Sequence, residues 1–472
     1  MNKFYITTAI DYVNDTIHIG HAFQKIAADV LARYWRLRIG KDNVFFLTGT
    51  DEYGQKAEKA ARNGGITPSE FVKKISDSDQ KQQDSLNISY NRFIRTTDHD
   101  HIKVAQEIWK KVDESGDIYL GEYSGLYCEG CEAYYTEGDL VNGQCPFHPN
   151  LKIQKVTEEN YFFRWSKYKD FLINYIKDNP NFIFPKHRAN EMLEFAKNIK
   201  DIPVSRKNFK WGIPVPEHPE QVIYVWFDAL INYISGVGYL EDKKLFEKFW
   251  PADVHILGKD NLRWHSLLWT AMLKSAGIEL PKTIIVNGFL NINGQKISKS
   301  LGNVIRPTDW VEKYGTDAVR YYLLRYTVLT EDGDISEEKL IQAYNSDLAN
   351  DLGNLVSRVA KLAENSDLTL NDPFEEKFGE DVKISLENFQ LSSGLVNIWS
   401  QINITNGIIN NEEPWKIEDK KKLKDTVWRY IKSIQYISYN LRPFLPETAK
   451  KIEEQFKGPK IKSADPLFPR IK

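Results

Sequence analysis

Residues 16–21 read Thr-Ile-His-Ile-Gly-His, and the residues around them indicate how this part of the chain folds. The apolar run at 4–8 predicts a buried strand, and apolar residues recur at helical spacing over 22–38. The two histidines therefore lie on the first turn of a helix that follows a strand, where unpaired amides and the helix dipole favour phosphate. Gly20 allows a ligand to approach the backbone closely. Taken alone, two surface histidines at a helix start would be the commoner arrangement.

A second motif lies far downstream at residues 294–303, which read Gly-Gln-Lys-Ile-Ser-Lys-Ser-Leu-Gly-Asn. Lysines on a glycine-bracketed loop can close on a triphosphate, although an ordinary solvated basic loop would have the same composition. In this order the two motifs resemble HIGH and KMSKS, the signatures of the class I aminoacyl-tRNA synthetases. Ile297 stands where that family usually has Met.

This resemblance implies an ATP-dependent enzyme in which the two motifs hold the triphosphate, with Mg²⁺ bound to the ATP. Positively charged and hydrogen-bonding side chains would stabilise the charge that develops on the phosphates. The residues that match the catalytic positions are His18, His21, Lys296 and Lys299. The residues that match ATP-binding positions are His18, Gly20, His21, Lys296, Ser298, Lys299 and Ser300.

Length and composition are those of an ordinary soluble protein with more than one domain. The chain has 472 residues and a net charge of −2, so any RNA contact must come from local basic patches rather than from overall attraction. It has neither a bilayer-spanning apolar run nor an N-terminal signal pattern, which predicts a cytoplasmic protein that does not contact membranes.

The cysteines form a metal-binding pattern. Cys128-x2-Cys131 is followed after thirteen residues by Cys145-x2-His148, and no other cysteine is present. Three thiolates and an imidazole match a closed tetrahedral zinc site, whereas buried free cysteines would not explain the paired spacing. Because four protein ligands leave no position for substrate, we predict one structural zinc ion.

Strand and helix patterns predict an α/β protein with a Rossmann-type parallel sheet, split by a zinc-binding insertion and followed by an all-α helical bundle. The sheet pattern resumes with a strand that begins at 222 and leads into a helix, and continues at 253–258 and 282–289; no strand pattern follows 335. The predicted parts are 1–117 and 220–290 (catalytic domain), 118–219 (insertion), 291–340 (KISKS loop and stem-contact region), 341–457 (anticodon-binding bundle) and 458–472 (a tail, draped on the body or disordered).

Within class I, the chain most resembles the methionyl-tRNA synthetases. The stretches 9–12 (Ala-Ile-Asp-Tyr) and 225–229 (Val-Trp-Phe-Asp-Ala) are similar to that family, and the interval between the signatures has no room for a large editing insertion. A thioether is favoured beside aromatic rings, which suits the aromatic residues available here. The resemblance implies that methionine is bound by Ala9, Ile10, Tyr12, Asp51, Trp226, Ala229, Tyr233, Trp264 and His265, with Asp51 holding the ammonium group. From the residues alone, Asp51 could equally be a turn residue or helix cap, and each aromatic a core residue.

The implied reaction forms methionyl-adenylate from L-methionine and ATP and then transfers methionine to the terminal adenosine of tRNA(Met). The positions that match anticodon readers are Asn354, Arg358 and Trp415, although a polar helix face and a packing residue would be the commoner explanation. Tyr53 stands where the family commonly has His. We expect a monomer, because no dimerisation domain follows the bundle. Three alternatives stay open: a synthetase for another amino acid, a nucleotidyltransferase unrelated to tRNA, and a non-catalytic RNA-binding paralogue.

Overall fold

The computed structural model describes residues 2–131, 133–135, 137–207, 209–297 and 302–471. Two compact units make up the chain. The sheet unit consists of Met1–Ile17, Lys41–Gln82 and Tyr90–Val286, and the helical unit consists of His18–Gly40, Gln83–Ser89 and Asn287–Lys472. The predicted fold class is confirmed, because a parallel sheet with an inserted cysteine cluster precedes a helical C-terminal region. The exact domain limits stay a prediction.

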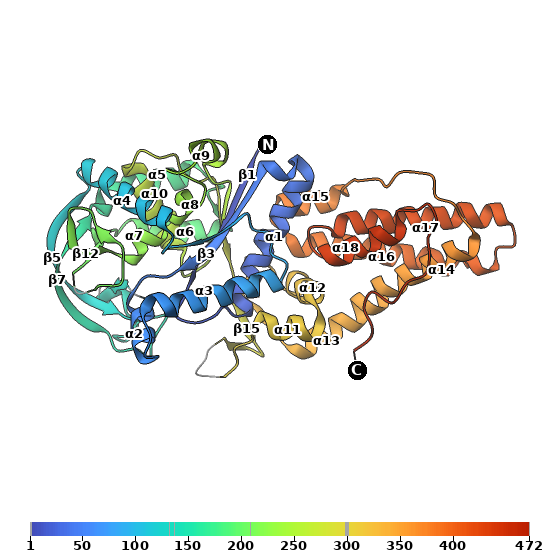
Figure 1. Cartoon of the computed structure of the whole chain (residues 1–472), viewed down its shortest axis with the longest axis horizontal. Helices are drawn as coiled ribbons and strands as arrows, with labels where there is room; N and C mark the ends of the chain where they lie inside the picture. The colour runs from blue at the N-terminus through green and yellow to red at the C-terminus, as the bar shows by residue number, and fades with distance from the viewer. Residues whose placement is uncertain (1, 132, 136, 208, 298–301, 472) are drawn as a thin grey trace. The chain divides into compact units, whose positions relative to one another are not determined.

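The central strands of the main sheet, β1, β3, β13 and β14, are buried along their whole length, as a sheet covered on both faces requires. The hydrogen-bonded order of the main sheet is β2-β3-β1-β13-β14-β8, with β4 also paired to β3 (Figure 1). The pairings β1–β3, β1–β13, β2–β3, β3–β4 and β8–β14 are parallel. The strands are β1 (Phe4–Thr8), β2 (Asp11–Tyr12), β3 (Val44–Asp51), β4 (Arg92–Arg95), β8 (Ile183–Phe184), β13 (Val254–Gly258) and β14 (Ile284–Asn287).

The helices of this unit supply the rest of its core. α4 (His99–Glu114) packs against α8 (Asn232–Ser235) and α10 (Thr270–Ser275). The other helices are α2 (Gln55–Asn63), α3 (Pro68–Ser85), α5 (Lys169–Asp178), α6 (Lys186–Ala196), α7 (Val225–Ala229) and α9 (Lys243–Phe249). The segment Trp264–Trp269 (η4), which precedes α10, is a π-helix. Such wide turns are rare and occur mostly at functional sites.

The insertion is a four-stranded antiparallel sheet of order β6-β5-β7-β9, and the long strands β5 (Ile118–Cys128) and β7 (Gln154–Phe163) run side by side (Figure 1). Its shorter strands are β6 (Ala133–Tyr135) and β9 (Ile202–Pro203). Two details differ from the sequence-based expectation. β8, inside the predicted insertion, pairs with the main sheet. The strand expected to begin at 222 is β12 (His218–Ile223), which pairs antiparallel with β10 (Ser205–Arg206) and β11 (Pro214–Val215) instead of joining the main sheet.

The helical unit begins with α1 (Ile19–Ile39), and a buried ion pair fixes this helix to the rest of the unit. Asp29 of α1 lies 2.8 Å from Arg320 of α12 (Thr316–Tyr326), and neither side chain is exposed. The Arg320 guanidinium also donates to the carbonyl oxygens of Leu86, Pro443 and Phe444. Because its hydrogen-bond donors are satisfied, a buried arginine of this kind holds the segments that it contacts in fixed positions.

Beyond α1, this unit has a small sheet of order β16-β15-β17 and then only helices among the described residues. The expectation that no strand follows 335 is confirmed, since β17 ends at Ile335. The strands are β15 (Leu290–Ile292), β16 (Gln295–Lys296) and β17 (Gly333–Ile335). The helices are α11 (Pro307–Tyr314), α13 (Glu337–Ala343), the π-helical η6 (Tyr344–Gly353), α14 (Asn354–Ser366), α15 (Glu380–Glu387), α16 (Leu391–Glu412), α17 (Lys420–Leu441) and α18 (Pro446–Phe456).

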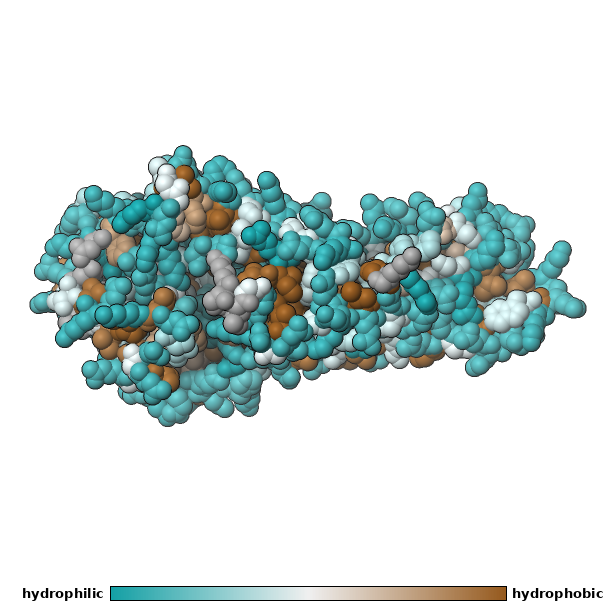
Figure 2. Space-filling model, turned by 90° about the horizontal axis from the view of Figure 1, so that it is seen from below, coloured by the Kyte–Doolittle hydropathy of each residue, from teal (hydrophilic) through white to brown (hydrophobic). Residues whose placement is uncertain are grey.

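The C-terminal tail lies on the helices, which agrees with the first of the two sequence-based expectations, a tail draped on the body. The Leu370 amide donates to the carbonyl oxygen of Pro459, and Asn345 exchanges two hydrogen bonds with the backbone of Ile471. No helix in the described residues has the length and apolarity needed to cross a membrane. On the face that Figure 2 shows, hydrophobic residues form separate patches divided by hydrophilic ones.

Candidate active site and metal centre

The signature turn caps its own helix. The Gly20 amide donates to Nδ1 of His18 (3.1 Å), and the His18 amide donates to Nδ1 of His21 (3.2 Å). Because both Nδ1 atoms accept, each neutral ring carries its proton on Nε2, and an Nε2–H can donate to an anionic oxygen. Desolvation, with the Lys25 ammonium nearby, lowers the pKa of His21 to about 4. The expected helix-start position of both histidines is confirmed.

The two signatures meet within the helical unit. A Cβ on Gly20 would lie 2.9 Å from Cε1 of His18 and 3.7 Å from Cδ1 of Ile297, so only glycine fits between them. The Ile19 amide also donates to the carbonyl oxygen of Ile305, just beyond the second motif. Ile297, the residue that departs from the family pattern, thus places its apolar side chain next to Gly20, as the usual Met could also do.

The second motif starts on a β-hairpin instead of a free loop. β15 and β16 pair antiparallel, Gly294 turns the chain at φ +75°, and its amide donates to Oδ1 of Asp334 (2.6 Å). Lys296 is therefore an exposed residue at the end of a strand. The predicted residues Ser298, Lys299 and Ser300 lie outside the described residues.

Aromatic side chains gather in the sheet unit as the resemblance implied. Trp226 of α7 and Trp264 of η4 stack with ring centroids 4.7 Å apart, and the Trp165 ring is nearly parallel to that of Trp264, with centroids 6.3 Å apart. Trp165 is 3% exposed. The Trp226 Nε1–H is buried and has no hydrogen-bond partner among the described residues. An indole donor held in this way is available to a ligand.

Tyr233 and His265 form the polar part of this group. The Tyr233 hydroxyl lies 2.6 Å from Nε2 of His265, and Nδ1 of His265 lies 2.9 Å from the carbonyl oxygen of Asn261. A carbonyl can only accept, so Nδ1 carries the proton and Tyr233 donates to Nε2. Burial lowers the pKa of His265 to about 4, which keeps this ring neutral at physiological pH.

Four of the remaining predicted pocket residues lie at the carboxyl ends of parallel strands, where such folds bind ligands. Ala9 and Ile10 directly follow β1, and Tyr12 is paired in register with Asp51. Asp51 is the last residue of β3, and it is 8% exposed. Ala229 ends α7 close to Trp226 in the chain and is buried. These placements group all nine predicted residues in one unit.

Tyr53, the residue that departs from the family, is buried beside Trp211, with ring centroids 5.3 Å apart. The Trp211 indole donates to the carbonyl oxygen of Glu52 (2.7 Å). Burial raises the pKa of the Tyr53 hydroxyl, helped by Asp228 and Glu52, so this group stays protonated at physiological pH. A histidine at this position would titrate much nearer neutrality.

One buried polar group behind the pocket was not identified from the sequence. His101 of α4 places Nε2 2.7 Å from Oδ1 of Asp228 and Nδ1 2.8 Å from Oγ of Ser235, and all three side chains are buried. Asp228 lies on α7, which carries Trp226 and Ala229. Ser235 ends α8, which carries Tyr233. Asp228 lies inside the quoted stretch 225–229, but His101 lies 127 residues away in a segment without a motif.

The cysteine cluster has the geometry of a metal site. One ligand atom from each of Cys128, Cys131, Cys145 and His148 lies within 4.8 Å of every other. Sγ of Cys131 is 3.4 Å from Sγ of Cys145 and 3.2 Å from Nδ1 of His148. A tetrahedral zinc ion with bonds near 2.3 Å to sulfur needs ligand separations of roughly 3.8 Å, so the four residues fit zinc. A Cβ on Gly130 would meet the His148 ring, which explains the glycine between the first two ligands.

The predicted anticodon residues lie together on the helical unit. Asn354 and Arg358 are one turn apart on α14, and the Arg358 guanidinium lies 6.0 Å from the ring centroid of Trp415. Arg358 also donates to Oδ1 of Asn410 (2.8 Å). Trp415 is 57% exposed, unlike a bundle-packing residue. We call these three residues the anticodon patch.

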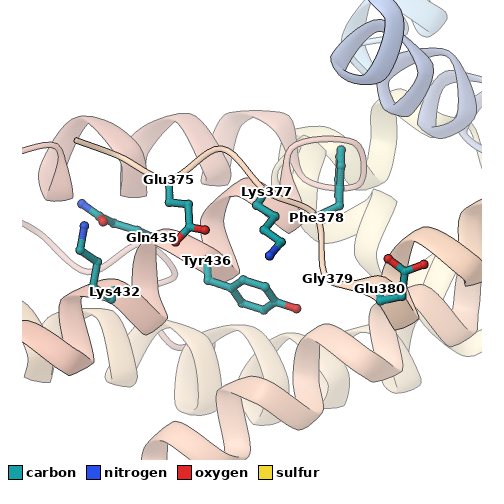
Figure 3. A pocket seen from close by; sticks show the side chains of 8 residues that line it. All are labelled: Glu375, Lys377, Phe378, Gly379, Glu380, Lys432, Gln435 and Tyr436. Atoms are coloured by element: carbon teal, nitrogen blue, oxygen red, sulfur yellow. The ribbon is translucent and has the colours of Figure 1, made fainter. Parts of the chain in front are cut away.

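A cavity of about 410 Å³ in the helical unit contains none of the predicted residues. Its walls come from the segment before α15 and from α17, and Figure 3 shows the Tyr436 ring directed toward Gly379. A Cβ on Gly379 would lie 1.8 Å from the Tyr436 hydroxyl, so glycine is required there. The lining residues are Glu375, Lys377, Phe378, Gly379, Glu380, Lys432, Gln435 and Tyr436.

Comparison with known proteins agrees with this geometry. The family model described as "tRNA synthetases class I (M)" matches residues 4–154 and 150–360. Methionine--tRNA ligase of Caldanaerobacter subterraneus subsp. tengcongensis is 43% identical over 99% of this chain and 79% of its own length. The Rickettsia conorii enzyme of that name is 41% identical over 96% of this chain and 92% of its own length.

Among solved structures, Mycobacterium tuberculosis methionyl-tRNA synthetase in complex with methionyl-adenylate superposes with a TM-score of 0.92. It is 36% identical, and the match covers 100% of both chains. The fold and the two signatures are those of the class I aminoacyl-tRNA synthetases. Within that class, the chain belongs to the methionyl-tRNA synthetase family.

Proposed function

We propose that this chain ligates methionine to tRNA(Met) in two steps. First, a carboxylate oxygen of methionine attacks the α-phosphorus of ATP, and the bond to the bridging oxygen breaks to release pyrophosphate. Then a ribose hydroxyl of the terminal adenosine attacks the carbonyl carbon of methionyl-adenylate, and AMP leaves. Neither step needs a protein nucleophile, so the protein contributes positioning and charge stabilisation.

The observation that carries this proposal is the meeting of the two signatures at Gly20 and Ile297. His18 and His21 each direct a proton-bearing Nε2 away from the helix cap, and Gly20 leaves its backbone open to phosphate. Lys296 and Lys299 would close on the phosphates, together with the hydroxyl groups of Ser298 and Ser300. Mg²⁺ bound with ATP would neutralise part of the phosphate charge.

The amino-acid site that we propose is the group of nine residues in the sheet unit. Stacked indoles favour a thioether. The neutral Tyr233–His265 pair adds polar atoms without a charge that would reject an apolar side chain. We assign Asp51 to the methionine ammonium, because a carboxylate at a strand end is the one acidic member of this set.

We propose one zinc ion on Cys128, Cys131, Cys145 and His148, in a structural role because all four tetrahedral positions are filled by protein. We further propose that Asn354 and Arg358 bond the edges of anticodon bases and that Trp415 stacks on one of them. The protein would act in the cytoplasm, where tRNA is charged, and as a monomer; light scattering at working concentration tests the latter.

The deciding experiment is ATP–pyrophosphate exchange with each of the twenty amino acids in turn, without tRNA. Exchange driven by methionine alone is the expected result. Exchange driven by another amino acid would keep the chemistry but contradict the assigned pocket. If no amino acid drives exchange even after tRNA is added, the chain is a binding paralogue instead. His21→Asn serves as a control, because it should depress exchange while the fold, followed by circular dichroism, survives.

A further inference from the structure

A side chain that is not itself a ligand hydrogen-bonds to the metal cluster. The Tyr135 hydroxyl donates to Sγ of Cys131 at 3.0 Å, and Tyr135 is 3% exposed. Donors of this kind to a coordinating thiolate orient it and stabilise its charge. Tyr135 ends β6 and belongs to the hydrophobic core of the sheet unit.

The Tyr135 ring also contacts a guanidinium group. Arg263 lies over the Tyr135 ring at 5.4 Å and over the Trp264 ring at 4.4 Å, with Phe195 a third ring at 5.8 Å. Among the described residues, no carboxylate lies within ion-pair distance of Arg263. Its charge is therefore stabilised by cation–π interactions with the aromatic rings, which strengthen when water is excluded.

Trp264 links this contact to the proposed amino-acid site. It stacks on Trp226, and it begins the π-helical segment that also carries His265. Arg263 directly precedes that segment. A shift of the guanidinium would therefore change the position of an indole that we assign to methionine binding.

We propose that Tyr135 and Arg263 are positioning residues that couple the metal cluster to the methionine pocket. Metal binding orders Cys131, the Cys131 thiolate orients Tyr135, and Tyr135 with Arg263 fixes Trp264. This proposal rests on the proposed function, because it takes methionine as the ligand of the pocket. By thermodynamic linkage, methionine must then raise the affinity for zinc by the same factor by which zinc raises the affinity for methionine.

The test measures zinc affinity of the full-length protein by equilibrium competition against a colorimetric chelator, with and without saturating methionine. In the wild type we expect methionine to tighten zinc binding roughly three- to tenfold. In Arg263→Met, which keeps the side chain's bulk but loses its charge, this factor should fall to about one. Tyr135→Phe should lower it as well and should also weaken zinc binding in the absence of methionine.

A matched control is Arg164→Met, because Arg164 also lies 4.4 Å over a tyrosine ring, that of Tyr119, in the inserted sheet. It should keep the wild-type coupling. The second readout compares the KM for methionine with the KM for ATP. Zinc-loaded Arg263→Met should raise the KM for methionine roughly three- to tenfold and leave the KM for ATP unchanged.

Two results would overturn the proposal: an effect of methionine on zinc affinity that is the same in Arg263→Met as in the wild type, or no effect in the wild type. If removing zinc unfolds the protein, the two KM values of the zinc-loaded variant test the proposal instead. An unchanged KM for methionine in Arg263→Met would then contradict the coupling. A failure of the proposed function is distinct from these outcomes, because the wild type would then show no methionine-driven exchange.

Discussion

The proposed methionine pocket and the proposed anticodon patch both contain tryptophan, but they hold it in opposite ways. In the pocket, Trp226 and Trp264 are already stacked on each other; Trp264 is buried and Trp226 is partly buried. In the patch, Trp415 is 57% exposed, and the Arg358 guanidinium lies 6.0 Å from its ring centroid. A small ligand gains from a site that folding has already organised. A base splayed from an RNA loop supplies its own ring and needs an open partner. Burial therefore separates the two sites more clearly than composition does.

The largest effect should come from the charge in the pocket. Asp51→Asn keeps the shape but leaves the methionine ammonium without a counter-charge at an enclosed site. We expect kcat/KM for methionine in pyrophosphate exchange to fall about 100- to 1000-fold, the cost of breaking a buried pair. Asp42→Asn, at an exposed position of the same unit, should change it less than twofold. A loss below tenfold for Asp51→Asn would remove Asp51 from the ammonium site.

The pocket should also make the sheet unit sensitive to acid. Burial lowers the pKa of His265 to about 4, below the value near 6.5 of an unfolded histidine, so between these values the unfolded state binds the extra proton. Stability from this group is complete above pH 6.5 and is lost as the pH falls toward 4, by roughly 3 kcal/mol at most. Urea unfolding at pH 7 and pH 4.5 should show a smaller difference in His265→Gln than in the wild type. Equal differences would contradict the buried neutral ring.

In the patch we expect a smaller loss that spares the first reaction step. Trp415→Ala removes a stacking surface worth about 1–3 kcal/mol, so kcat/KM for tRNA(Met) should fall roughly 5- to 150-fold. Exchange without tRNA should stay within twofold of the wild type. Trp428→Ala is the matched control, because Trp428 is a partly exposed tryptophan of the same unit whose indole donates to Asp372. Equal losses in both steps for Trp415→Ala would show that the patch acts through the fold.

The smallest effect should come from Arg358. Arg358→Gln loses the contact with the Trp415 ring and the hydrogen bond to Asn410, which together are worth about 1 kcal/mol, or roughly a fivefold loss in kcat/KM for tRNA(Met). In a double-mutant cycle the loss should shrink when Trp415 is already Ala, since neighbouring residues are not additive. Strict additivity would mean that the two residues read the RNA independently.

Much of the architecture was predictable because local patterns carry it. Buried parallel strands must be apolar along their length, and β1 and β13 were identified within one residue on that basis. The metal cluster was predictable because ligand spacing within the chain reflects the geometry of the ion. β12 was misassigned because an apolar strand of an antiparallel sheet cannot be told from one of a parallel sheet over so few residues.

The sequence by itself determined the class of fold, the candidate metal ligands and the two signature motifs, because each depends on residues close together in the chain or on a family pattern. Only the tertiary structure decided which buried groups touch. It paired β8 with the main sheet and His101 with Asp228, made a neutral pair of Tyr233 and His265, and placed Arg263 between Tyr135 and Trp264. The physical reason is that packing is set by contacts between distant segments, and a buried ring or imidazole has the same local pattern whichever neighbour it meets.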